Sequence, residues 1–309
     1  MKSRILFALT CLLPPVAFAQ PSQGTPTENI IVTAPRAVPE QAAHDFVKSF
    51  TGVSPASGKI ARWRMGVCPV VTGLPPSGLT LVRERVRQVA GQVGAPVGAQ
   101  SCKPNIDIVF TLNPQVLLDE VRKKTPVLLG FHDVAQQERL ATVTHPVQAW
   151  YTTQTVDLNF NRYVDDKLRN HGGFYIVGSD GPKYGSVFVP DARVVQASGS
   201  RIADGLSSEL YHVVIVINVT KVNGLTVGAL TDYAAMLELA QTQSFESCAP
   251  MATITNLVSP GCDAAVKTDA LSASDLAYLQ GLYSIDPRAS LVHQKAEIAD
   301  RMQKGRETN

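Results

Sequence analysis

The 309-residue sequence has little charge and lacks the motifs of several common catalytic sites. Charged residues make up 17% of it and the formal net charge is +2, so no strongly basic surface favours nucleic-acid binding. It has no Gly-rich phosphate loop, GxSxG elbow, CxxC pair or internal repeat. The hydrophobic content of 45% is that of a globular protein, and the sequence offers no basis for a nucleotide-binding or serine-hydrolase site.

Histidine is also sparse and scattered. The six histidines show no His-x-His or His-x-x-x-His spacing; they stand at positions 44, 132, 145, 171, 212 and 293. Because a zinc site in one element needs such spacing, we expect no metal ion and no other cofactor. A site assembled from distant histidines remains an alternative.

The first nineteen residues have the pattern of a secretory signal peptide. Lys2 and Arg4 precede an apolar run over residues 5–16, and a small-x-small sequence ends at Ala19. We expect cleavage after Ala19 and a periplasmic or secreted protein. No later stretch is apolar enough to predict a transmembrane segment.

Residues 20–43 are rich in Pro, Thr and Gln and predict a flexible linker. Within it, residues 28–34 (ENIIVTA) resemble the short TonB-interacting box near the start of outer-membrane receptors. We favour a tether or an added edge strand, because no barrel-like run of strands follows. The resemblance nevertheless gives one alternative function, an accessory of TonB-linked outer-membrane transport.

The cysteine count fits an exported protein. Of five cysteines, Cys11 lies in the signal peptide and four remain. An even number in an oxidising compartment indicates two disulfides, for which three pairings are possible. Closeness in the sequence favours Cys68–Cys102 and Cys248–Cys262. We expect both to be structural.

The hydrophobic pattern predicts an α+β fold with a mixed sheet. A strand over residues 60–71, an amphipathic helix over 79–93 and a strand over 105–111 form a βαβ unit with parallel strands. A short helix at 116–124 is followed by four further strands, expected at 147–156, 173–178, 186–189 and 211–219. We expect one domain over residues 44–287 and an exposed, charged helical tail over 288–309.

Residues 227–241 predict a central, largely buried helix with Thr226 as its N-cap. At the helical period, apolar residues fill one face and the remaining positions lie opposite or beside it; these are Thr231, Asp232, Ala235, Glu238 and Gln241. A second helix over residues 271–283 has Ser272 as N-cap and Asp275 to complete a capping box. Its expected buried stripe is Leu276, Leu279 and Leu282.

The second helix resembles the C-terminal helix of matrixin-type metzincins, which are zinc peptidases. The shared pattern is Leu271-Ser272-x-x-Asp275-Leu276-x-x-Leu279-Gln280-x-Leu282-Tyr283. In that family the preceding helix carries His-Glu-x-x-His and a third His further on. The resemblance places Thr231, Ala235 and Gln241 at the ligand positions, Asp232 at the general base and Glu238 at the helix-ending Gly. It implies a zincin-like domain whose cleft has lost its metal ligands, with residues 251–257 in the turn beneath.

These observations predict an exported, non-catalytic protein of the cell envelope that binds an extended peptide, or an envelope partner, in the remnant cleft. A hydrolase with an unrecognised site near Thr231, Asp232 and Glu238 is the alternative. A carboxylate pair of Asp232 and Glu238 would serve such an enzyme. We favour the simpler interpretation that both lie on a solvated helix face.

Overall fold

The computed structural model describes residues 40–130, 132–165, 173–177, 186–190, 197, 204–243 and 247–304. The predicted signal peptide and the TonB-like residues 28–34 therefore lie outside the described residues. Helix α1 (Glu40–Phe50) begins before the predicted end of the linker at residue 43. The reason is an apolar stripe of Ala43, Phe46, Val47 and Phe50, which is buried against the domain.

The main sheet is mixed, which confirms the predicted α+β class. Its order is β2 (Pro69–Thr72), β3 (Ile106–Thr111), β8 (Ser207–Asn218), β4 (Val147–Val156) and β5 (Arg162–Val164). β2, β3 and β8 run parallel, whereas β4 is antiparallel to both of its neighbours. The predicted βαβ unit is present, because β2 and β3 are joined through α2 (Pro76–Gln92).

The strand expected over residues 60–71 is in fact two strands. β1 (Ala61–Arg62) pairs with β8, while β2 pairs with β3. Between them Trp63 is fully buried and its indole N–H donates to the carbonyl oxygen of Glu238 at 2.7 Å. The chain therefore changes its sheet partner where an aromatic side chain is drawn into the core. β6 (Gly173–Val177) and β7 (Ser186–Pro190) form a separate antiparallel pair.

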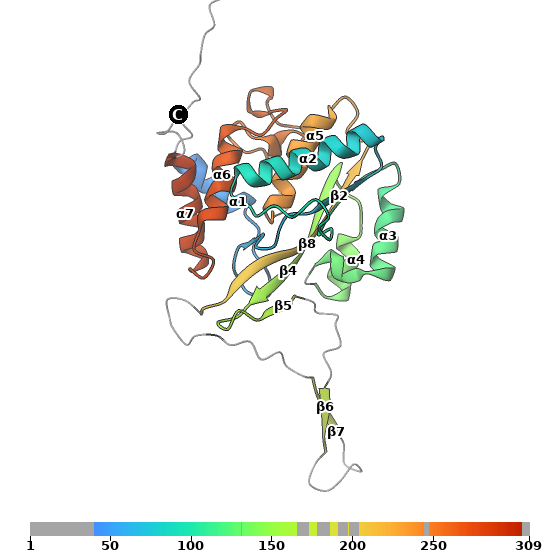
Figure 1. Cartoon of the computed structure of the whole chain (residues 1–309), viewed down its shortest axis with the longest axis vertical. Coiled ribbons are helices and arrows are strands. Elements are labelled where there is room, and N and C mark those ends of the chain that lie inside the picture. Colours follow the sequence, from blue (N-terminus) through green and yellow to red (C-terminus); the bar gives the residue numbers. More distant parts are fainter. Residues whose placement is uncertain are drawn as a thin grey trace, which may run out of the picture. The chain divides into compact units, whose positions relative to one another are not determined.

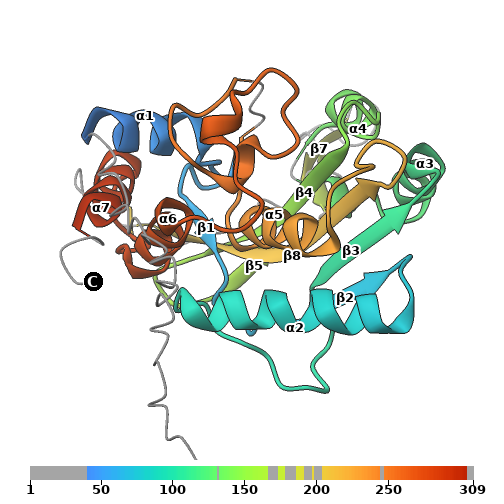
Figure 2. The same cartoon turned by 90° about the horizontal axis from the view of Figure 1, so that it is seen from above.

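Helices cover both faces of the main sheet (Figure 2). α2 and α5 (Val227–Leu239) lie on one face, together with α1, α6 (Ala273–Ser284) and α7 (Leu291–Lys304). The smaller core on the other face is formed with α3 (Pro114–Lys124), the 3₁₀ turn η1 (Pro126–Leu129) and α4 (Val134–Leu140). Because β8 lies between the two cores, residues 213–217 are apolar on both faces.

α5 is enclosed on all sides, and every residue from Ala229 to Leu239 is buried. It begins at the predicted N-cap, where the Thr226 hydroxyl oxygen accepts the N–H of Ala229 at 3.1 Å. It ends at Leu239, earlier than predicted, and Ala240 is extended. The carbonyl of Gln241 instead accepts the N–H of Gly52 at 2.8 Å, so the chain after α5 is tied to the loop after α1.

The helix that carries the metzincin-like pattern lies against α5. The Leu271 N–H donates to Asp232 Oδ2 at 3.0 Å, and the Tyr283 hydroxyl donates to the carbonyl of Leu239 at 2.8 Å. The predicted capping box is present, because the side chains of Ser272 and Asp275 each accept the backbone N–H of the other. The two segments that suggested the resemblance are therefore neighbours in space.

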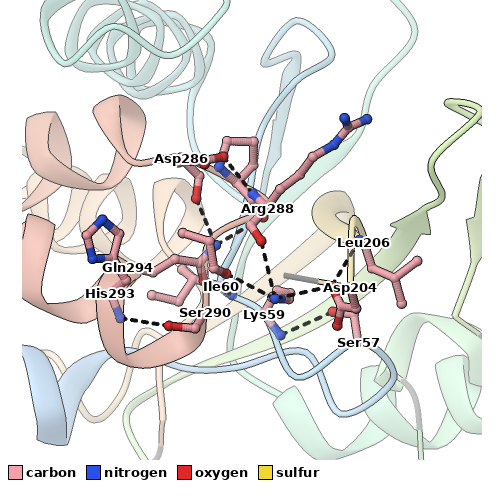
Figure 3. A network of polar contacts seen from close by, with 12 residues as sticks. Ser57, Lys59, Ile60, Asp204, Leu206, Asp286, Arg288, Ser290, His293 and Gln294 are labelled. Carbon is pink, nitrogen blue, oxygen red and sulfur yellow. Dashed lines mark hydrogen bonds and ion pairs between the residues drawn. The ribbon is translucent and has the colours of Figure 1, made fainter. Parts of the chain in front are cut away.

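The prediction of an exposed tail is wrong for residues 291–304. α7 packs on α1 and α6 through Ile298, Ala299 and Met302, which are almost fully buried (Figure 1). Gln294 ties α7 to β1, because its Oε1 accepts the Ile60 N–H at 3.1 Å and its Nε2 donates to the carbonyls of Asp286 and Pro287 (Figure 3). Charged residues surround the buried residues of α7 in the sequence, so the composition of the segment does not reveal its apolar stripe.

The turn before Gln294 is anchored by a buried lysine. Lys59 Nζ donates to the carbonyl of Ala289 at 3.0 Å and lies 3.3 Å from Asp204 Oδ1 (Figure 3). Because a buried ammonium needs partners, these contacts fix the turn between α6 and α7 onto the loop before β1.

The two disulfides are the pairs that closeness in the sequence favours. Cys68 is bonded to Cys102 and Cys248 to Cys262, with Cα–Cα distances of 6.0 and 5.5 Å. Such bonds are compatible with an extracellular or periplasmic protein. Among the described residues, no helix has both the length and the apolar character needed to cross a bilayer.

Candidate functional site

A groove of about 1050 Å³ runs beside β4. Residues 147–151 of β4 form its floor, and α5 contributes Tyr233 and Leu237 to one wall. η1, α4 and the following turn form the opposite wall. Gly52, Val53 and Pro55, together with residues 241–243 and 258–260, complete its lining. Its walls therefore come from elements distant in sequence that meet at one sheet edge.

The outer edge of β4 is open over the first part of the strand. The Asn218 N–H donates to the carbonyl of Pro146 at 2.8 Å, and Gln148 and Trp150 lie opposite Val216 and Val214 of β8. Backbone groups alternate sides along an antiparallel strand, so Val147 and Ala149 direct their N–H and C=O groups away from β8. β5 pairs only with residues 154–156 of β4, and no described residue hydrogen bonds to these outward groups.

Gly130 bounds the open edge at Tyr151. A Cβ at Gly130 would lie 2.6 Å from the Tyr151 carbonyl oxygen, and Gly130 has a φ of 94°, so a side chain is excluded twice over. On the other side the Tyr151 hydroxyl donates to the carbonyl of Leu237 at 2.9 Å. Burial raises the pKa of Tyr151 and of Tyr233 well above that of a free phenol, so both are neutral hydrogen-bonding groups.

A buried cluster of hydroxyls lies at the far end of the strand. Asp165 is almost fully buried and its carboxylate accepts hydrogen bonds from Ser54, Thr153 and Thr155, at 3.3, 2.6 and 2.8 Å. Three donors compensate the burial of one carboxylate. Only Thr153 of this cluster also lines the groove, so the cluster supports the groove's end and is not itself an open site.

The would-be ligand positions do not face the groove. Thr231 and Ala235 are fully buried, and at 3.6 residues per turn they lie nearly opposite Tyr233 and Leu237. The Thr231 hydroxyl donates to the carbonyl of Val227 within its own helix. Only Gln241, which follows α5, lines the groove, and its Nε2 lies 3.4 Å from the carbonyl of Val53.

The interpretation of Asp232 and Glu238 as a solvated face is wrong. Their exposed fractions are 4% and 0%. Arg85 of α2 and the Leu271 N–H cover Asp232, whereas Glu238 lies in the core near Tyr151 and Tyr283. Asp232 is ion-paired with Arg85 of α2, with Nε–Oδ1 at 2.7 Å and Nη2–Oδ2 at 2.9 Å. Among the described residues Glu238 has no hydrogen-bond partner for either carboxyl oxygen, and its burial raises its pKa well above the usual value.

No arrangement for metal binding appears in the part of the chain that the structure describes. It contains no group of three His, Cys, Asp or Glu side chains placed to hold an ion. The nearest polar contact to a catalytic pattern is His212 Nε2 with Asp107 Oδ2 at 2.9 Å, which joins β8 to β3. This pair is a cross-strand contact, and neither of its residues lines the groove.

The sequence identified β4 as a strand with the correct bounds but gave no reason to place a site on it. The edge is open because β5 pairs only with residues 154–156 of β4. The opposite wall comes from η1, α4 and the turn that follows α4. Comparison with family models, curated proteins and solved structures finds no match for this chain.

Proposed function

We propose that this chain is an exported, non-catalytic protein of the cell envelope that binds an extended peptide as an added strand on β4. The observation that supports it is the open edge of the strand at Val147 and Ala149 beside a groove with apolar walls. Extended peptides bind proteins by pairing with such an edge, where backbone groups supply affinity and side-chain pockets supply selectivity.

The proposal includes descent from a metallopeptidase-like scaffold. Its support is the order of elements, in which β8 leads into α5 and the antiparallel β4 lies beside β8, together with the contact of residues 271–283 with α5. A non-catalytic role is supported by the chemistry of the replaced positions. Ala235 cannot bind a metal, and the Asp232 carboxylate is already engaged by Arg85 and the Leu271 N–H.

Export to the periplasm or the medium rests on the signal-like residues 1–19 and on the two disulfides. The hydrolase alternative has weaker support, because Thr231, Asp232 and Glu238 are enclosed and do not converge on a shared open space. The alternative of an accessory in TonB-linked outer-membrane transport is supported only by the sequence of residues 28–34.

The test removes one outward N–H and leaves the pairing with β8 intact. Peptides that bind are first selected from a display library of random short peptides on the immobilised mature protein. The Ala149→Pro variant is then compared with Ala149→Val, which has a similar side-chain volume and keeps the N–H. Proline is tolerated on an edge strand where its missing N–H faces outward, so both variants should fold.

We expect Ala149→Pro to weaken binding of the selected peptide about tenfold or more, because a backbone hydrogen bond is lost and the ring obstructs the incoming strand. Ala149→Val should bind like the wild type. Far-UV circular dichroism and the unfolding midpoint check that both variants are folded. Equal affinities of the two variants, or a library that yields no binder, would refute the proposal.

A further inference from the structure

We infer that the groove selects an acidic peptide that runs antiparallel to β4, with its carboxyl end beside Lys221. The inference rests on the proposed peptide binding and adds the chemistry and direction of the ligand.

The groove lining is basic. Among the described residues that line it are Arg139, Lys221, His132 and His145, and none of those described residues is Asp or Glu. Arg139 and Lys221 are exposed, and neither makes an ion pair with any residue in the described part of the chain. Some basic residues outside the lining have a counter-charge: Arg122 pairs with Glu138, and Lys124 pairs with Glu120. Arg139 and Lys221 instead give the groove positive charge that no ion pair within the described residues balances, and this charge favours a ligand that carries carboxylates.

This charge is not evenly spread along β4. Lys221 follows β8 and His145 precedes β4, and the bond from the Asn218 N–H to the Pro146 carbonyl brings these two chain segments together. Lys221 and His145 therefore both lie at the start of β4. Toward the end of the strand, the Tyr151 hydroxyl donates to the carbonyl of Leu237 and the Thr153 hydroxyl donates to Asp165.

Lys221 therefore favours a carboxylate at the start of β4. A strand added antiparallel to β4 brings its own C-terminus to this end.

The experiment compares four synthetic peptides with one apolar core, taken from a peptide that binds. The first has two Asp residues and a free carboxylate at its C-terminus, the second has the Asp residues at its N-terminus, the third is neutral and amidated, and the fourth has two Lys residues at its C-terminus. Dissociation constants are measured by fluorescence anisotropy at low salt and at high salt.

We expect the first peptide to bind about fivefold more tightly than the neutral one at low salt, with the advantage lost at high salt, and the Lys peptide to bind least. The Lys221→Gln/Arg139→Gln variant should bind the first and third peptides equally. A matched variant, Lys124→Gln/Lys304→Gln, removes the same charge outside the groove lining and should keep the preference.

The outcomes separate the inference from the proposed function. If the neutral and acidic peptides bind equally well, the acidic preference is overturned while peptide binding stands. If the peptide with N-terminal Asp residues binds most tightly, the direction is overturned. If none of the four binds, the proposed function fails as well.

Discussion

Arg85 on α2 and Asp232 on α5 form a bidentate ion pair. The metzincin-like resemblance predicted from the sequence would put Asp232 at the position of a general base. Asp232 is nearly buried, with 5% of its side chain exposed, whereas 34% of the Arg85 side chain is exposed. The hydrogen bonds that Arg85 donates to Asp232 raise the pKa of the Arg85 guanidinium. A carboxylate held this way is a structural link between α2, α5 and the start of α6.

The first prediction concerns this link. Arg85→Ala should lower the free energy of unfolding by about 2 kcal/mol, because it leaves the Asp232 carboxylate buried with only the Leu271 N–H as partner. Partial exposure of Arg85 keeps the loss below that of a fully buried pair. Urea unfolding followed by fluorescence measures it.

Arg83→Ala is the matched control on the same helix, since Arg83 is about half exposed and contacts only its neighbour Glu84; we expect a change within about 0.5 kcal/mol. The double variant Arg85→Ala/Asp232→Asn should lose less unfolding free energy than the Arg85→Ala and Asp232→Asn variants lose together, because it leaves no buried charge without a partner. Additive losses would show that the pair carries no coupling.

Glu238 leads to a prediction about pH. Its carboxyl group is buried without a hydrogen-bond partner, so its pKa in the folded protein lies above that in the unfolded chain. Between the two pKa values the folded state holds the proton more tightly, and stability falls as pH rises. We expect this loss to begin near the unfolded pKa of about 4.3 and to grow by about 1.4 kcal/mol per pH unit until the folded pKa is reached.

Glu238→Gln removes the titration and keeps the shape. The difference in unfolding free energy between variant and wild type should therefore increase in favour of the variant from pH 4.5 to pH 7.5. Glu84→Gln, an exposed position on α2, controls for the loss of one negative charge. A difference that stays constant across this range would mean that Glu238 is not protonated preferentially in the folded state.

The elements of this fold could be predicted where a local pattern was strong. The alternation of Ile106, Ile108 and Phe110, the capping box of Ser272 and the apolar stripe of α5 each occur within a few residues. Such patterns determine element type, and the parallel βαβ unit follows from their order.

The environment of the polar residues could not be predicted in the same way. Asp232 and Glu238 look like a solvated face because charged side chains usually are. Asp232 is covered by Arg85 and Leu271, and Glu238 lies near Tyr151 and Tyr283, all of which are remote in sequence. The prediction of an exposed C-terminal helix was wrong for a related reason. Gln294 and Ile298 are buried because α1 and α6 lie beside them. Tertiary contacts determined these positions.

The last prediction separates the roles of the two disulfides. The Cys248–Cys262 bond closes the segment that contributes residues 258–260 to the groove, whereas Cys68 and Cys102 lie outside the groove lining. By loop-closure entropy, loss of the shorter Cys248–Cys262 crosslink should cost about 3 kcal/mol, and loss of the Cys68–Cys102 crosslink about 4 kcal/mol. Stability alone would therefore rank Cys68–Cys102 as the more important bond.

Peptide binding should give the opposite order. With Cys248→Ser/Cys262→Ser, the wall at residues 258–260 is less constrained, and more ordering entropy must be lost on binding. We expect its affinity for a selected peptide to fall severalfold, while Cys68→Ser/Cys102→Ser binds like the wild type at a temperature where both variants are folded. Thermal unfolding ranks the two variants by stability, and anisotropy titrations on the same samples rank them by peptide affinity. Since a general loss of stability would weaken both variants in the order of their unfolding free energies, only a reversed order in affinity connects the Cys248–Cys262 bond with the groove.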